Sequence, residues 1–168
     1  KDTFAEIAPR YVFMNHLMTG GVDILLRREV VRLARPQTGE SLLDVGCGTG
    51  DLAKEVLRAF PTTDVTAADF SLEMMTATDD WQTIKRVEAD ALQLPFADAS
   101  FDLVTSGYLV RNVIDLATAL SEQFRVLKPG GRVFILDMTR PRHNLLTPFI
   151  NFYLSKIVPL LGSIFNRN

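Results

Sequence analysis

Three glycines at alternate positions, Gly46, Gly48 and Gly50, follow directly on a short apolar stretch that ends at residue 45. Glycine lacks a Cβ atom, so a backbone built this way can bend sharply and approach a ligand closely. We expect a helix to follow at residues 51–59, and the amides of its first turn would point toward a ligand in the glycine turn. The stretch therefore predicts a site in which a small molecule lies against the backbone.

The spacing of the glycines distinguishes two ligand classes. The dinucleotide fingerprint is G-x-G-x-x-G, whereas here the third glycine comes one residue early and Asp44 lies within the preceding strand. The pattern D-x-G-x-G-x-G instead resembles motif I of the S-adenosylmethionine (SAM) methyltransferases, where Cys47 and Thr49 would also border the cofactor. SAM carries no phosphate, so Asp44 beside the turn is compatible with it and can help to hold the charged methionine end. Cys47 is interpreted as a small filler of the turn.

The elements around this turn alternate between short apolar runs and amphipathic stretches. Continuous apolar runs are typical of buried strands in a parallel sheet, and alternation with helices implies right-handed crossovers. Ligands of such sheets bind at the carboxyl ends of the strands. We expect strands at residues 41–45, 64–68, 86–88, 101–106 and 132–136, with helices near 22–35, at 51–59, around 71–82 and at 115–127.

Polar residues follow the predicted strands at the edge where a ligand would bind. Asp69, followed by Phe70, ends the second strand and can accept hydrogen bonds from both ribose hydroxyls. Asp90, followed by Ala91, comes after the third strand and can accept from the adenine amino group, while Gly107 follows the fourth. Either acid alone is more commonly a solvated loop residue or a helix cap. Acids at the ends of three successive strands beside a glycine turn favour a ribose-and-adenine pocket.

Composition narrows the function classes. The 168 residues fit one domain, and 18 basic against 20 acidic side chains argue against a nucleic-acid partner. One cysteine excludes an internal disulfide framework and predicts a reducing, cytoplasmic setting. Two histidines are too few for a metal cluster, and no apolar run is long enough to span a bilayer.

Four further motifs carry a more specific resemblance. They are Ala8-Pro-Arg-Tyr11 with Met14-Asn15, Leu94-Pro-Phe96, Arg111-Asn112-Val113, and Phe152-Tyr153 with Pro159-Leu-Leu-Gly162. With the glycine turn and Arg125-Val-Leu-Lys-Pro-Gly-Gly131, they make the chain similar to the ubiquinone/menaquinone biosynthesis C-methyltransferase family from Phe4 to its last residue. The resemblance implies a Rossmann-like class I methyltransferase fold, SAM as methyl donor with S-adenosylhomocysteine (SAH) as product, and C-methylation of a prenylated quinol such as demethylmenaquinol.

The same resemblance suggests roles on the acceptor side. C-methylation needs a quinol ring made electron-rich by loss of a hydroxyl proton. Arg111 stays protonated, so it would stabilise the phenolate or position a water that takes the proton. Asn112 can hydrogen-bond a quinol oxygen, and Tyr108 would line the same pocket. The rival interpretation of Arg111-Asn112 is a helix start capped by Asn112.

The chain also departs from the family pattern, mostly in its N-terminal part. The family signature of Tyr-Asp-x-Met-Asn, then Ser, His and Trp, is replaced at Val12, Thr19, Asp23 and Leu26. These departures favour one alternative, a methyltransferase for another small molecule, acting on carbon, oxygen or nitrogen. A second alternative, a SAM-binding subunit without turnover, also stays open. A dehydrogenase ranks last because the glycine spacing is wrong.

We divide the single domain into N-terminal lid helices (1–35), a SAM-binding core (41–137) and a C-terminal helical segment (138–168). The last segment is apolar and basic without any acid, typical of either an interfacial helix or a buried one. With the arginines of the first helix it predicts access to a membrane surface; a homodimer also stays open. We expect residues to be missing near 76–85, and the antiparallel strand pair usual for this fold to be missing after 168. The basic residues concerned are Arg27, Arg28, Arg32, Arg35, Arg140, Arg142, Lys156 and Arg167.

Overall fold

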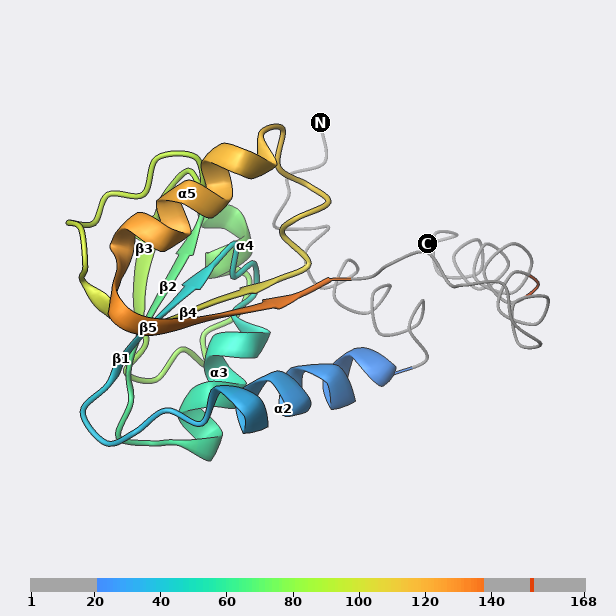
Figure 1. Ribbon diagram of the computed structural model, residues 1–168. Coiled ribbons are helices and arrows are strands. Elements are labelled where there is room, and N and C mark those ends of the chain that lie inside the picture. Colours follow the sequence, from blue (N-terminus) through green and yellow to red (C-terminus); the bar gives the residue numbers. More distant parts are fainter. Residues whose placement is uncertain (1–20, 138–151, 153–168) are drawn as a thin grey trace.

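The computed structural model describes residues 21–137 and residue 152, and within them a five-stranded parallel sheet has the order β3-β2-β1-β4-β5 (Figure 1). This confirms the predicted α/β class. The predictions for residues 1–20 and 138–168, apart from Phe152, lie outside the described residues. In chain order the elements are α2 (Val22–Ala34), β1 (Ser41–Val45), α3 (Asp51–Ala59), β2 (Asp64–Asp69), α4 (Leu72–Thr76), β3 (Lys85–Glu88), β4 (Phe101–Gly107), α5 (Leu116–Val126) and β5 (Leu127–Leu136).

Helices cover both faces of the sheet: α2 and α3 lie against one face and α5 against the other (Figure 1). Side chains alternate along a strand, so β1 feeds both layers. Leu42 is fully buried on the α2 and α3 side, and Leu43 is fully buried among the residues on the α5 side. Burial on both faces explains why β1 is a continuous apolar run interrupted by a single acid, Asp44.

Hydrogen bonds join the loops at the carboxyl edge to the neighbouring strands. The amides of Gly46 and Cys47 donate to the carbonyl of Ala68, at 2.8 and 3.1 Å. The Tyr108 amide donates to the Leu136 carbonyl, at 2.6 Å. These bonds extend the parallel ladders beyond the strands and hold the loops at one edge of the sheet.

The predicted helix at 71–82 is wrong beyond its first turns, since α4 spans only Leu72–Thr76. Ser71 caps it by accepting from the Met74 amide at 3.2 Å. The chain then turns, because Trp81 packs into the core with 4% of its surface exposed and its indole nitrogen donates to the Thr78 carbonyl at 2.9 Å. This tertiary contact outweighs the local helical preference.

Four strand boundaries also differ from the prediction, and two of these differences are that β2 and β4 each end one residue later, at Asp69 and Gly107. β5 begins at Leu127, not 132, because Leu127 already pairs with Phe101; Gly130, at φ +80°, lies in the irregular stretch before pairing resumes at Arg132. The β4–β5 register shifts between Phe101 and Leu103, as expected beside a bulge. β3 begins one residue earlier than predicted, at Lys85.

Within residues 21–137 and at residue 152, none of the helices combines the length and apolarity needed to cross a bilayer.

Candidate functional site

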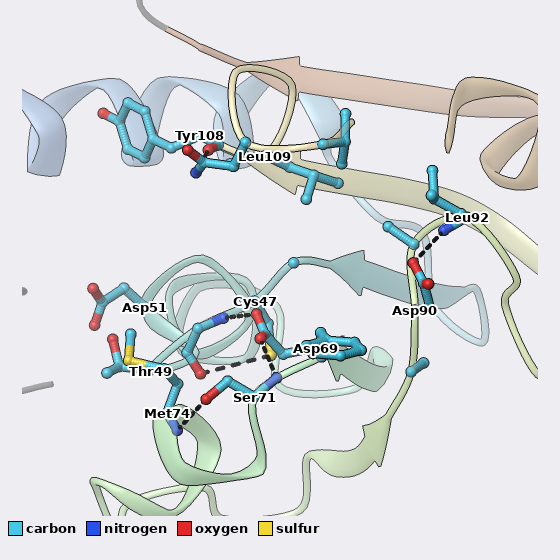
Figure 2. A pocket seen from close by; sticks show the side chains of 18 of the residues that line it. Cys47, Thr49, Asp51, Asp69, Ser71, Met74, Asp90, Leu92, Tyr108 and Leu109 are labelled. Atoms are coloured by element: carbon cyan, nitrogen blue, oxygen red, sulfur yellow. Dashed lines mark hydrogen bonds between the residues drawn. The ribbon is translucent and has the colours of Figure 1, made fainter. Parts of the chain in front are cut away.

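A cavity of about 760 Å³ lies at the carboxyl edge of the sheet, bordered by the loops that follow β1, β2, β3 and β4 (Figure 2). Pockets that hold small molecules are usually about 300–1,000 Å³. The sequence-predicted site residues that line it are Gly46, Cys47, Gly48, Thr49, Asp69, Phe70, Asp90, Ala91, Gly107, Tyr108 and Asn112.

Asp69 links the end of β2 to the glycine turn. Its Oδ2 accepts from the Gly48 amide at 2.7 Å and its Oδ1 from the Ser71 amide at 2.8 Å (Figure 2). An ionised carboxylate offers about four acceptor positions. Asp69 therefore holds the turn in place and keeps acceptor capacity on the cavity side, as recognition of a ribose diol requires.

The glycine turn has the shape that a cofactor resting on the backbone needs. Gly46, Gly48 and Gly50 all have positive φ, between +56° and +80°, which side chains disfavour. A Cβ at Gly48 would come no closer than 3.6 Å to any other group, so this position opens into the cavity. A Cβ on Gly46 would collide with Leu109 and one on Gly50 with Trp81. Gly50 therefore allows Trp81 to pack closely against the turn, and it is not among the residues that line the cavity.

The loops after β2 and β3 supply a polar and an aromatic wall. The Asp90 Oδ1 accepts from the Leu92 amide at 2.9 Å, which fixes the carboxylate at the cavity rim (Figure 2). Phe70 lines the cavity with 76% of its surface exposed to solvent. An exposed ring beside an acid is a suitable environment for a purine, which stacks on aromatic faces and donates from its amino group.

Asp44, which the sequence predicts at the methionine end of the cofactor, is not among the residues that line the cavity. Side chains alternate, and Asp44 faces α3 together with Leu42, where it is completely buried. Its Oδ1 accepts from the Thr105 hydroxyl at 2.8 Å. Burial raises the pKa of Asp44 to about 7, although the Thr105 hydroxyl and the Ala53 amide oppose that shift.

The raised pKa of Asp44 predicts a pH-dependent stability. Between about pH 4, near its ordinary pKa, and about pH 7, the folded protein binds a proton that the unfolded chain releases. The free energy of unfolding therefore falls as the pH rises through this window. In thermal melts at pH 5 and pH 8, the Asp44→Asn variant should lose less stability than the wild type. If the variant and the wild type lost equal stability between pH 5 and pH 8, the raised pKa of Asp44 would be contradicted.

The acceptor-side residues occupy a tight turn after β4. Tyr108 has φ +59°, and the Asn112 amide group donates to the Tyr108 carbonyl at 2.9 Å. The rival interpretation of Asn112 as a helix cap is wrong, because α5 begins later and its cap is Asp115. The Arg111 guanidinium lies 5.2 Å from the centre of the Tyr108 ring, outside the cavity lining. Burial is the main reason why the pKa of Tyr108 is raised.

Sequence reasoning missed several lining residues. Asp51, Ser71 and Leu92 lie within two residues of predicted positions, so the loops after the strands were a usable signal. Arg27 had no such signal, because it comes from α2, before the first strand. The remaining missed residues are Met74, Ala89, Leu109, Val113 and Ile114, which are all apolar.

The described residues indicate neither a metal-binding site nor a catalytic nucleophile. No group of three or more histidine, cysteine or acidic side chains there is arranged to hold a metal ion. Burial and the nearby acids Asp44 and Asp69 raise the pKa of the Cys47 thiol, which disfavours a reactive thiolate.

Comparison with known proteins identifies one methyltransferase family. Residues 1–168 match the model of the ubiE/COQ5 methyltransferase family. The ubiquinone/menaquinone biosynthesis C-methyltransferase UbiE of Desulfotalea psychrophila is 44% identical over 167 residues, which are 95% of this chain and 66% of that protein. The demethylmenaquinone methyltransferase of Thermus thermophilus is 38% identical over 170 residues, covering 98% of this chain and 77% of that protein.

Solved structures share the fold. A candidate SAM-dependent methyltransferase of Methanococcus maripaludis superimposes with a TM-score of 0.69 at 23% identity, covering 99% of this chain and 78% of that one. The YcgJ protein of Bacillus subtilis gives a TM-score of 0.63 at 26% identity, covering 75% of this chain and 56% of that one. The chain thus spans 56% of the YcgJ chain and 66% of the D. psychrophila protein.

Proposed function

Because the chain belongs to the ubiE/COQ5 methyltransferase family of SAM-dependent methyltransferases, we propose that it methylates a ring carbon of a prenylated quinol such as demethylmenaquinol. One observation carries the proposal. A single cavity joins the polar group of Asp69, Asp90 and the glycine turn to an apolar wall of Leu109, Val113 and Ile114. The polar part suits the nucleoside of SAM, and the apolar part suits an isoprenoid acceptor.

Methyl transfer of this kind is an in-line displacement. The electron pair of the ring carbon forms the new bond to the methyl group, the bond from methyl to sulfur breaks, and SAH leaves. The ring carbon then loses its proton. The protein contributes mainly by holding the two reactants in line, which requires no nucleophilic side chain.

On the acceptor side, we assign Asn112 to a quinol oxygen and Arg111 to the negative charge that develops on the ring oxygen. Asn112 lines the cavity. Arg111 lies beside Tyr108, and its amide donates to Asp137 at 3.2 Å. A small movement of this exposed side chain would bring its charge toward a bound ring.

Turnover with demethylmenaquinol and isotopically labelled SAM tests this function. We expect menaquinol to form with the wild type and the rate to fall by about 10- to 100-fold in Asn112→Ala, with an unchanged Kd for SAM. The matched control is Thr118→Ala, which removes the hydrogen bond that the Thr118 hydroxyl in α5 donates to the cap residue Asp115. Absence of product with a protein that binds SAM would contradict the quinol assignment.

The departures from the family on α2 favour a second candidate, a methyltransferase for another small molecule. Asp23 stands where the family pattern has histidine, and it is completely buried in an ion pair with Arg27. This charge pair changes the helix that borders the cavity. A panel of phenolic and amine acceptors in the same assay distinguishes the candidates, because only this second function predicts turnover of a ring without a prenyl chain.

We also propose that the protein works at the cytoplasmic surface of a membrane, where a prenylated quinol resides. Ile114 lines the cavity with 94% of its surface exposed, and Leu116, two residues further along the chain, is also exposed; both side chains are available to contact lipid. On α2, Arg28 pairs with Glu55 and Arg32 with Glu29, which reduces the basic character of that helix. We expect sedimentation with vesicles to increase with anionic lipid. Equal sedimentation with neutral vesicles would contradict the electrostatic part of this proposal.

A further inference from the structure

Arg27 is the one basic side chain among the described residues that line the cavity. It faces Asp51, the first residue of α3, with 3.4 Å between the Arg27 Nη2 and the Asp51 Oδ2. The same two residues also line a smaller hollow of about 200 Å³, together with Ile24 and Glu55. The ion pair therefore forms part of the wall between two hollows.

Asp23 holds the guanidinium from the other side. Its completely buried Oδ2 lies 3.1 Å from the Arg27 Nη1, one helical turn away on α2. Only 13% of the Arg27 side chain is exposed. Arginine has a rigid fork of five N–H donors, so a fork anchored by Asp23 presents its remaining donors in a fixed direction.

The order of the strands indicates which part of a ligand would reach this pair. Asp90 follows β3, Asp69 ends β2 and the glycine turn follows β1, in the spatial order β3-β2-β1-β4. A ligand with its adenine near Asp90 and its ribose near Asp69 extends across the turn toward β4. Tyr108 follows β4, and the Arg27 guanidinium lies 5.9 Å from the centre of its ring.

The methionine end of SAM carries a carboxylate and an ammonium group, which match a guanidinium beside a carboxylate. We propose that Arg27 donates to the carboxylate of SAM and that Asp51 accepts from its ammonium group. This inference rests on the proposed SAM-dependent function and assigns the remaining part of the cofactor site. The 3.4 Å separation of the pair is longer than the roughly 2.7–2.9 Å of a direct charge-assisted bond. Both groups thus keep capacity for a ligand.

The proposal also identifies Asp51, and not Asp44, as the acid that contacts the methionine end of SAM. Asp44 was the predicted partner of the methionine end, but it is buried beneath α3 and lies outside the cavity lining. Asp51 lines the cavity directly and has 33% of its side chain exposed. Asp51 is therefore the acid of the glycine-turn region that a bound amino acid can reach.

Titration calorimetry with three ligands tests the inference on the whole chain. The ligands are SAM, decarboxylated SAM, and 5′-methylthioadenosine, which lacks the amino acid entirely. In Arg27→Gln we expect the Kd for SAM to rise by about 10- to 100-fold, with changes below about twofold for decarboxylated SAM and 5′-methylthioadenosine. The wild type should bind decarboxylated SAM more weakly than SAM by a similar factor. Arg28→Gln is the matched control, because this neighbour pairs with Glu55 and does not line the cavity.

A second variant and two overturning outcomes complete the test. Arg27→Gln also removes the ion pair with the buried Asp23, so Asp51→Asn provides a second variant at a partly exposed position. This variant should weaken the binding of SAM but not that of 5′-methylthioadenosine. If both variants bound all three ligands more weakly by the same factor, the assignment of Arg27 and Asp51 to the amino-acid end of SAM would be overturned. The proposal that the protein binds SAM would still stand. A wild type that binds none of the three ligands would overturn the SAM function and the inference with it.

Discussion

The Asp69→Ala substitution is expected to raise the Kd for SAM by more than about 100-fold. The variant loses a carboxylate that would accept from the two ribose hydroxyls. It also leaves the Gly48 amide without the partner that it has at 2.7 Å. Both effects act on the same ligand, because the glycine turn and the ribose share one wall of the cavity.

Calorimetry with SAM measures this loss, and circular dichroism verifies that the variant is folded. Asp64→Ala is the matched control, since Asp64 begins the same strand and pairs with Lys85 at the opposite end of β2. Asp69→Asn keeps the side-chain shape and one oxygen, so it should give an intermediate affinity. An Asp69→Ala variant that binds SAM like the wild type would remove Asp69 from the site.

The Gly50→Ala substitution should be the most damaging to stability. Gly50 has φ +80°, and an added Cβ would lie 2.4 Å from atoms of the Trp81 ring. The backbone strain costs about 1–2 kcal/mol, and the forced movement of a buried ring adds about 1–3 kcal/mol. We expect the midpoint of thermal unfolding to fall by about 5–15 °C.

Gly130→Ala isolates the backbone-strain part of this effect. Gly130 has the same φ of +80°, but a Cβ there meets nothing within 4 Å. The difference between the two melting curves therefore reports the collision with Trp81. Similar melting temperatures for both variants would contradict the tight packing of Trp81 against the turn.

Much of the fold follows from local patterns. The apolar run of β1, the glycine turn and the acids after β2 and β3 are each contained in a few consecutive residues, so the sequence predicts them within one or two positions. α4 was overestimated because the burial of Trp81 depends on Gly50 and Lys54, which are distant in sequence. Periodicity within residues 71–82 contains no information about these contacts.

In the candidate site too, local sequence predicts some residues, whereas others depend on contacts between distant parts of the chain. Residues next to strand ends could be predicted, because a parallel sheet brings those ends to one edge. The burial of Asp44 could not be predicted from the motif alone, because it follows from the alternation of side chains along β1, which turns Asp44 toward α3. Arg27 could not be predicted, since only the packing of α2 against α3 brings it to the cavity.

The central claim is that SAM binds over the glycine turn, and an amide nuclear magnetic resonance titration tests it most directly. Glycine amides fall in a separate region of the spectrum, so the ten glycines can be followed individually. On addition of SAM, we predict large shifts for Gly46, Gly48 and Gly107, which line the cavity, and none for Gly130 and Gly131 in β5. Shifts confined to other glycines, or no shifts at saturating SAM, would contradict the site described above.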